Sequence, residues 1–358
     1  MSDRRLLAVG ACVLTLLVCG RMAWAAAPRL DPASVQIKAA TVPLSSFASP
    51  QARAAFIAAR KQPPEPNFGA NVTALRQFHS KGTDKILAEM KRRYATDISS
   101  GRMGGVRVEV VVPSTGIAPQ NRDRVLIELH SGGFLWGAGS EALLEAIPIA
   151  AVGRIKVVSV DYRMAPESAF PAASADVAAV YQALLQQFRP QDIGIYGCSA
   201  GGILAAESVA WFAAHHIAQP GAIASLCGTG AELQGDSAYL APALLGTGGI
   251  PVGGKPLLLA DLPYFKGVSE ENPLAFPIVS PTVLKQFPPT LLIAGDRDFT
   301  ASSETLMQRR LWEAGVHSDL FIFDGLWHAF MMDPKLPESR EVYGIVCRFF
   351  DQHLQESK

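Results

Sequence analysis

Ser199 is the residue of this sequence most clearly placed to act as a nucleophile. It lies in the run YGCSAGG, residues 196–202, between an apolar segment and a strongly helical one. A strand that turns tightly into a helix can hold a serine hydroxyl exposed, provided that small residues such as Gly197 and Gly201 flank it. In a chain with 31 glycines, the motif G-x-S-x-G at 197–201 can also arise by chance. The prediction of a nucleophile therefore depends on the strand before the motif and the helix after it.

His328 is the predicted base for this serine. An alcohol is a poor nucleophile near neutral pH, so it needs a base to remove its proton and an acid to orient that base. His328 lies in the run GLWHAF, residues 325–330, just after a predicted strand late in the chain. That position suits the chain order of serine, acid and histidine. His317 begins the same strand, which places it at the opposite end of the sheet, and His353 falls in a predicted terminal helix.

Two aspartates compete for the part of the acid. Asp296 and Asp298 both follow the predicted strand at 290–294, and either could reach the loop that carries the histidine. Asp324 is a weaker third alternative because it precedes the histidine by only four residues. The aspartate that does not contact the histidine is expected to pair with Arg297 or to cap the following helix.

A glycine-rich loop could bind the negative oxygen that forms when a serine adds to a carbonyl. The run LHSGGF, residues 129–134, comes directly after the apolar strand predicted at 125–129. Glycines let backbone N–H groups point into a site, and the N–H of Ala200 would add a further donor from the turn after the serine. The loop is therefore predicted to be an oxyanion hole.

The elements that must hold these residues alternate between short apolar strands and helices, which predicts an α/β fold with a mainly parallel, helix-covered sheet. The predicted strands cover 106–112, 125–129, 155–160, 193–196, 222–226, 290–294 and 319–323. The predicted helices cover 141–152, 173–188, 200–215, 303–314 and 339–354. The catalytic domain is thus expected at 106–358, with a weakly periodic insertion at 228–287 that is typical of a cap over a site. Residues 26–105 are predicted to form a lead-in followed by one or two amphipathic helices between 73 and 98.

Residues 1–25 have the pattern of a secretory signal peptide. Arginines near the start precede an apolar run at 6–19, and AWA at 23–25 offers a cleavage site near Ala25. The run is shorter than the roughly 20 apolar residues of a spanning helix, and Arg21 interrupts it, so an uncleaved anchor is the weaker alternative. No later segment reaches that length. The sequence predicts export to the periplasm or the medium, without stable membrane insertion.

Composition excludes several other classes of protein. The 32 basic and 32 acidic residues balance, which argues against a nucleic-acid partner. The seven histidines lack cysteine or histidine partners at helical spacing, so no metal and no cofactor are expected. Three cysteines lie outside the predicted signal peptide: Cys198, Cys227 and Cys347. They fall in predicted apolar elements and not at the spacings typical of a disulfide framework, so they are predicted to be free buried thiols.

Four motif blocks together give the chain a resemblance to a known family. They are HSGGF at 130–134, DYRMAPE at 161–167, the turn around Ser199, and GLWHAF at 325–330. From about residue 106 to its end the chain resembles the hormone-sensitive-lipase family (family IV) of the α/β-hydrolases. This resemblance implies an eight-stranded, mostly parallel sheet and a helical cap built partly from residues before 106.

The resemblance also assigns residues. The family's interval of 30 residues between acid and base favours Asp298 over Asp296. Its oxyanion donors correspond to Gly132, Gly133 and Ala200. Ser131 replaces the first glycine of the family's HGGG pattern, which bears on the conformation of the loop rather than on its chemistry.

The DYRMAPE block is interpreted as a structural turn, in which Arg163 and Glu167 are expected to form an ion pair beneath the site.

The sequence therefore predicts hydrolysis of carboxylic esters with small to medium acyl groups through an acyl-enzyme on Ser199, with a small-molecule ester as the partner. Two alternatives remain open. The same triad could cleave an amide, a lactone or a peptide, and a hydrolase fold can also serve as a ligand-binding module without catalysis. The natural ester, its stereochemistry and the oligomeric state of the protein are also left open.

Overall fold

The fold is a single eight-stranded sheet covered by helices on both faces. The computed structural model describes residues 41–62, 71–246, 256 and 258–354. The strands are β1 (Thr96–Met103), β2 (Val106–Pro113), β3 (Val125–Leu129), β4 (Lys156–Val160), β5 (Ile193–Cys198), β6 (Ala222–Leu226), β7 (Thr290–Gly295) and β8 (Ser318–Phe323). Their order across the sheet is β1-β2-β4-β3-β5-β6-β7-β8. The pairs β1·β2 and β2·β4 are antiparallel and the other pairs are parallel.

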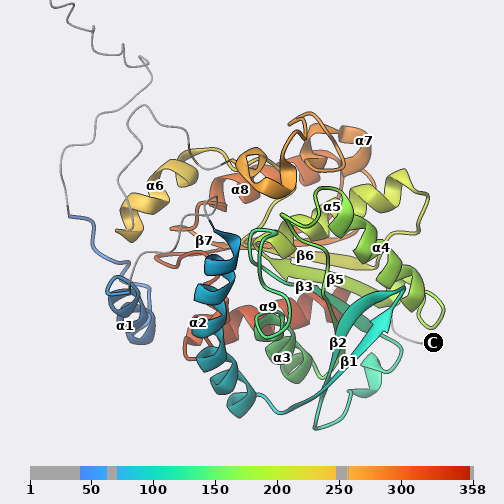
Figure 1. The fold of residues 1–358 in the computed structure, drawn as a ribbon, viewed down its shortest axis with the longest axis horizontal. Helices are drawn as coiled ribbons and strands as arrows, with labels where there is room; N and C mark the ends of the chain where they lie inside the picture. Colours follow the sequence, from blue (N-terminus) through green and yellow to red (C-terminus); the bar gives the residue numbers. More distant parts are fainter. Residues whose placement is uncertain (1–40, 63–70, 247–255, 257, 355–358) are drawn as a thin grey trace, which may run out of the picture. The chain divides into compact units, whose positions relative to one another are not determined.

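Helices cover both faces of the sheet, with α3 and α9 on one face and α4, α5 and α8 on the other (Figure 1). The long helices are α1 (Pro50–Ala59), α2 (Val72–Arg93), α3 (Ala142–Gly153), α4 (Ala172–Leu184), α5 (Ala200–Ala214), α6 (Asp236–Leu245), α8 (Ala301–Glu313) and α9 (Pro337–His353). α3 and α9 pack in one core cluster, and α4, α5 and α8 pack in the other. The central strands β3, β5, β6 and β7 are buried at every position, as expected for parallel strands covered on both faces.

The eight-stranded α/β fold is confirmed. One of its strands, β1, was not predicted from the apolar pattern of the sequence. The apolar spacing predicts helix as far as Ile98, but α2 ends at Arg93 and β1 begins at Thr96. β1 reads TDISSGRM and has exposed residues on both faces, so it lacks the apolar alternation that predicts a strand. The turn Gly104-Gly105, with φ of 55° and 84°, joins it to β2, and this glycine pair was the available hairpin signal.

The predicted insertion at 228–287 lies between β6 and β7 and adds no strand within its described residues. It contains α6, the short helix α7 (Pro281–Leu284) and three 3-10 turns, η3 (Leu259–Asp261), η4 (Pro263–Phe265) and η5 (Pro277–Val279). Leu233, Leu259 and Leu262 from this segment line the cavity beside Ser199. The segment therefore contributes walls to the site that the sheet positions.

The predicted signal peptide at 1–25, together with the rest of 1–40, lies outside the described residues, as do 63–70 in the lead-in and helical region and 247–255 and 257 in the insertion. Of the helices that are described, none is both long and apolar enough to cross a bilayer.

Candidate active site

Ser199 stands at a strained turn between β5 and α5. Its backbone adopts φ 56° and ψ −120°, a combination that few non-glycine residues take and that costs of order 1–3 kcal/mol. Leu129 of the neighbouring strand passes so close that a Cβ on Gly201 would meet its carbonyl oxygen at 1.7 Å, and one on Gly197 at 2.2 Å. The tight turn therefore requires glycine on both sides of the serine, as the motif predicted.

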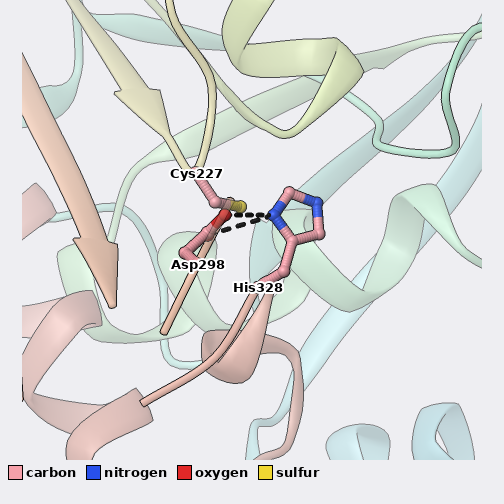
Figure 2. A group of neighbouring side chains, drawn as sticks. All are labelled: Cys227, Asp298 and His328. Carbon is pink, nitrogen blue, oxygen red and sulfur yellow. Dashed lines mark hydrogen bonds and ion pairs between the residues drawn. The ribbon is translucent and has the colours of Figure 1, made fainter. Parts of the chain in front are cut away.

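The structure brings the predicted nucleophile, base and acid into one hydrogen-bonded line. His328 Nε2 lies 2.9 Å from Ser199 Oγ, which suits donation by the hydroxyl. On the other side of the ring, Nδ1 lies 2.9 and 3.0 Å from the two carboxylate oxygens of Asp298. Figure 2 shows Asp298 and His328 pointing toward one another. Asp298 is fully buried and also accepts a hydrogen bond of 2.9 Å from the Thr300 N–H, so its position is fixed.

Asp296 takes a different part from Asp298. Its carboxylate accepts a 2.6 Å hydrogen bond from the N–H of Gly325 and so holds the start of the loop that carries His328. Burial raises the pKa of Asp296, and the neighbouring carboxyl of Asp324 adds to the rise. The two aspartates left open by local reasoning are thus separated by tertiary contacts, and Asp298 is the one placed against the imidazole.

The glycine-rich loop faces the serine across the cavity. Gly132, Gly133 and Ala200 all line the same cavity as Ser199. Gly132 and Gly133 have φ of 111° and 58°, which turns the backbone sharply away from β3. Within the described chain, no hydrogen bond to a protein acceptor engages the N–H groups of Gly132, Gly133 or Ala200. These three N–H groups are therefore available to an oxygen bound beside Ser199.

A buried aromatic pair supports this loop from below. The imidazole of His130 stacks on Tyr162, with ring centroids 4.0 Å apart, and its Nδ1 lies 2.7 Å from the carbonyl oxygen of Ser131. Tyr162 donates a 2.7 Å hydrogen bond to the His130 carbonyl. Burial lowers the pKa of His130 to about 4, so the ring is neutral near pH 7 and serves as a structural donor.

Two buried glutamates lie under the same loop, and the sequence reasoning gave them no part. Glu145 of α3 accepts a 3.2 Å hydrogen bond from the Ser131 N–H. Burial raises the pKa of Glu145 well above its ordinary value, the nearby Glu128 adds to the rise, and the backbone amides of Ser131 and Cys198 oppose it. Burial also raises the pKa of Glu128, to about 8. A lone glutamate inside each of two apolar elements was the sequence signal that could have found the pair.

The expectation of three free thiols is wrong for two of them. Cys198 and Cys227 form a disulfide with their Cα atoms 5.3 Å apart. Parallel pairing sets Cys198 at the end of β5 opposite Leu226 at the end of β6, so the next residue, Cys227, comes within bonding reach. Spacing along the chain gives no hint of this register. Cys347 is the free thiol among the described residues, and burial raises its pKa to about 12.

Cys227, Asp298 and His328 lie together (Figure 2) and their donor atoms are close enough for one metal ion. The sulfur of Cys227 is already bonded to Cys198, and both nitrogens of His328 face Ser199 and Asp298. The arrangement therefore suits proton transfer to and from the serine rather than metal binding.

The cavity beside Ser199 has a volume of about 380 Å³ and largely apolar walls. Those walls are formed by Phe134, Trp136, Ile203, Leu233, Leu259, Leu262, Phe299 and Met332. His79 of α2 also lines it and stacks flat on Trp136, with ring centroids 4.0 Å apart. His79 falls within the helical stretch predicted at 73–98, and its approach to the cavity depends on tertiary packing.

The ion pair expected between Arg163 and Glu167 does not form. Arg163 pairs with Asp176 of α4 at 2.8 Å, and Glu167 pairs with Arg76 of α2 at 2.7 Å. The Arg76 guanidinium lowers the pKa of Glu167 to about 2. Both partners come from outside the motif block, which explains why reasoning within the block missed them.

Comparison with known proteins agrees with this geometry. Residues 126–332 match the model of a family described as having the alpha/beta hydrolase fold. A protein named "Esterase" from Acinetobacter venetianus is 26% identical over 256 residues, 69% of this chain and 80% of its own length. A "Putative acetyl-hydrolase LipR" from Mycobacterium tuberculosis is 27% identical over 243 residues, 65% of this chain and 74% of its own length. The crystal structure of an esterase E25 superposes with a TM-score of 0.76 at 29% identity, covering 90% of this chain and 99% of that one.

A half-buried serine at a strand-to-helix turn, joined through a histidine to a buried aspartate, defines the class of serine hydrolases. Within that class, the chain belongs to the α/β-hydrolase fold family. The resemblance to the hormone-sensitive-lipase branch is confirmed by the family match and by the esterases among its relatives.

Proposed function

We propose that this protein hydrolyses carboxylic esters of small to medium acyl chain through an acyl-enzyme on Ser199. The observation that carries the proposal is the continuous line from Ser199 Oγ to His328 Nε2, 2.9 Å, and from His328 Nδ1 to Asp298, 2.9 Å. The reactive hydroxyl opens into an apolar cavity that also presents the N–H groups of the glycine-rich loop. Ester cleavage needs these three features together: a nucleophile with its base, an oxyanion site and a binding cavity.

In the first half of the reaction, His328 removes the hydroxyl proton as Ser199 Oγ attacks the ester carbonyl carbon. The carbonyl oxygen becomes negatively charged and accepts hydrogen bonds from the N–H groups of Gly132, Gly133 and Ala200. The carboxylate of Asp298 stabilises the imidazolium that forms. His328 then gives its proton to the leaving alcohol as the carbon–oxygen bond breaks, which leaves the acyl group on Ser199.

In the second half, water replaces the alcohol. His328 takes a proton from the water molecule, whose oxygen attacks the acyl carbon, and the same N–H groups bind the new oxyanion. Collapse of this intermediate returns the proton to Ser199 Oγ and releases the carboxylic acid. The cycle uses only side chains and amides of this chain, and no cofactor is required.

The size of the cavity supports the choice of acyl group. A volume of about 380 Å³ lies near the lower end of the range for small-molecule sites and suits an ester with a short or medium chain. The names of the relatives, an esterase and a putative acetyl-hydrolase, point the same way. They do not favour an amidase, lactonase or peptidase, nor a binding module without catalysis.

The decisive experiment compares Ser199→Ala with Ser208→Ala on a series of p-nitrophenyl esters of increasing acyl length. Ser208 is a matched control because its buried hydroxyl bonds only to its own helix, at the Leu204 carbonyl. We expect kcat to fall by about 10⁵-fold or more in Ser199→Ala, and to stay within about threefold in Ser208→Ala. Full activity of a folded Ser199→Ala protein would overturn the mechanism. A preference for long acyl chains would overturn the proposed substrate size.

We infer that the protein is exported to the periplasm or the medium and cleaved near Ala25. The charged start, apolar run and small-residue site of residues 1–25 support this. A disulfide between Cys198 and Cys227 is typical of proteins that fold in oxidising compartments. Mass spectrometry of the protein recovered from fractionated cells tests the inference, because a chain retaining residue 1 in the cytoplasm would contradict it.

A further inference from the structure

Three potential metal ligands meet at the edge of the sheet, at the end away from Ser199. They are His317, just before β8, Asp319 within β8, and His353, the last residue of α9. One donor atom from each lies within 4.8 Å of the others. The rings of His317 and His353 have centroids 4.7 Å apart, and His317 Nε2 lies 3.5 Å from Asp319 Oδ2.

Strand and helix geometry explain this meeting. Residues two apart on a strand point to the same face, so His317 and Asp319 extend side by side. α9 ends beside them, where the ring of its last residue, His353, lies against His317 and also contacts Phe349 at a centroid distance of 4.6 Å. His353 follows Asp319 by 34 residues, which is why local ligand spacing gave no sign of the cluster.

We propose that His317, Asp319 and His353 form a binding site for a divalent transition-metal ion, Zn²⁺ being the cation that suits them best. Two imidazoles and one carboxylate are a ligand set that zinc accepts, with a water molecule in the fourth position. Mg²⁺ and Ca²⁺ prefer oxygen ligands throughout, so the two imidazoles select against them.

The site needs only a small closure to bind an ion. In a tetrahedral zinc site with metal–ligand distances of about 2.0–2.2 Å, neighbouring donor atoms are about 3.3 Å apart. In the structure, the donor atoms of the three residues lie within 4.8 Å of one another. The side chains of His317 and Asp319 are 55% and 41% exposed, so rotation of each can close the gap without moving the backbone.

The site is separate from the catalytic triad, because His317 precedes β8 whereas Ser199 follows the parallel strand β5. A bound ion would join β8, an edge strand of the sheet, to the end of α9. We therefore assign it a stabilising role, with no part in ester hydrolysis.

The experiment uses the protein without a polyhistidine tag and compares wild type with His353→Gln, Asp319→Asn and the control His216→Gln, which removes an exposed imidazole elsewhere. Co²⁺, whose absorption reports tetrahedral coordination, and Zn²⁺ are the probes. We expect one Co²⁺ per chain in wild type and in the control, with binding weakened at least tenfold by either cluster substitution. Zn²⁺ at 100 times its wild-type dissociation constant should raise Tm by about 5 °C in wild type and in the control, and by at most about half as much in the cluster variants, with kcat unchanged.

Two results would overturn the proposal. One is the absence of Co²⁺ binding and of any Zn²⁺ effect on Tm in wild type. The other is equal binding in wild type and in both cluster variants, which would place the ion elsewhere. Asp319→Asn keeps the shape of an exposed side chain, so it remains a usable test if His353→Gln loosens the end of α9.

Discussion

Buried carboxyl groups lie on both sides of Ser199, and the two sides differ in how they are hydrogen-bonded. On the base side, Asp298 is fully buried but receives hydrogen bonds from His328 Nδ1 and the Thr300 N–H. On the oxyanion side, Glu128 and Glu145 are equally shielded from water, and burial raises the pKa of each because few donors replace that water. Similar burial is thus combined with different numbers of hydrogen-bond donors.

The difference matches what each side must do. A carboxylate that stabilises an imidazolium has to carry charge, and hydrogen bonds donated to a carboxylate favour its charged form. A carboxyl group that only holds the Ser131 amide can do so while neutral, without imposing a second negative charge near the developing oxyanion. Three substitutions test this contrast.

The largest expected effect comes from Asp298→Asn. The amide keeps the shape of the side chain but loses the charge and favours the wrong tautomer of His328, so kcat should fall by about 10⁴-fold. Stopped-flow or steady-state assays on a p-nitrophenyl ester measure this. Asp296→Asn is the matched control, because Asp296 contacts the Gly325 amide and not the imidazole. If both variants lost activity equally, the assignment of the acid would be wrong.

A smaller loss is expected from Glu145→Leu. The Ser131 amide would lose its acceptor, the oxyanion loop would loosen, and kcat should fall by about 10- to 100-fold with KM nearly constant, because the affected bonds form in the transition state. Glu145→Gln keeps an acceptor oxygen at the same position and should retain most of the activity. An equally inactive Gln variant would show that the charge of Glu145 matters, which would contradict its action as a neutral acceptor.

The smallest effect concerns stability and pH. Burial raises the pKa of Glu128 to about 8 in the folded state, whereas a glutamate carboxyl in the unfolded chain has its ordinary pKa of 4.5. The folded state therefore binds more protons between these values, and the free energy of unfolding should decrease as pH rises through that range. Glu128→Gln should flatten the decrease, as measured by urea unfolding from pH 5 to 8.5. The exposed Glu270→Gln is the control, and a slope unchanged by Glu128→Gln would contradict the raised pKa.

Local motifs predicted the residues whose position depends on a turn. Ser199 and the glycine-rich loop each come directly after a strand. Glycine is required at position 197 because a Cβ there would lie 2.2 Å from the carbonyl oxygen of Leu129. His328 followed from its place after the last strand. The fold class was predictable for the same reason, since the alternation of strands and helices repeats along the chain.

Contacts between distant segments were not predictable in this way. The Cys198–Cys227 disulfide depends on the register of β5 against β6, and the partners of Arg163 and Glu167 come from α4 and α2. β1 was missed because an edge strand with exposed residues on both faces has no apolar period.

The sequence by itself predicted the fold class, which the structure confirms, and the candidates for nucleophile, base and oxyanion loop, because each depends on short-range backbone geometry that glycine, serine and apolar periodicity encode. Only the tertiary structure decided which aspartate meets the imidazole, which cysteines pair, how deeply the glutamates are buried and which histidines gather at the end of α9. These depend on distances between segments far apart in the chain, and such distances are set by packing of the whole core.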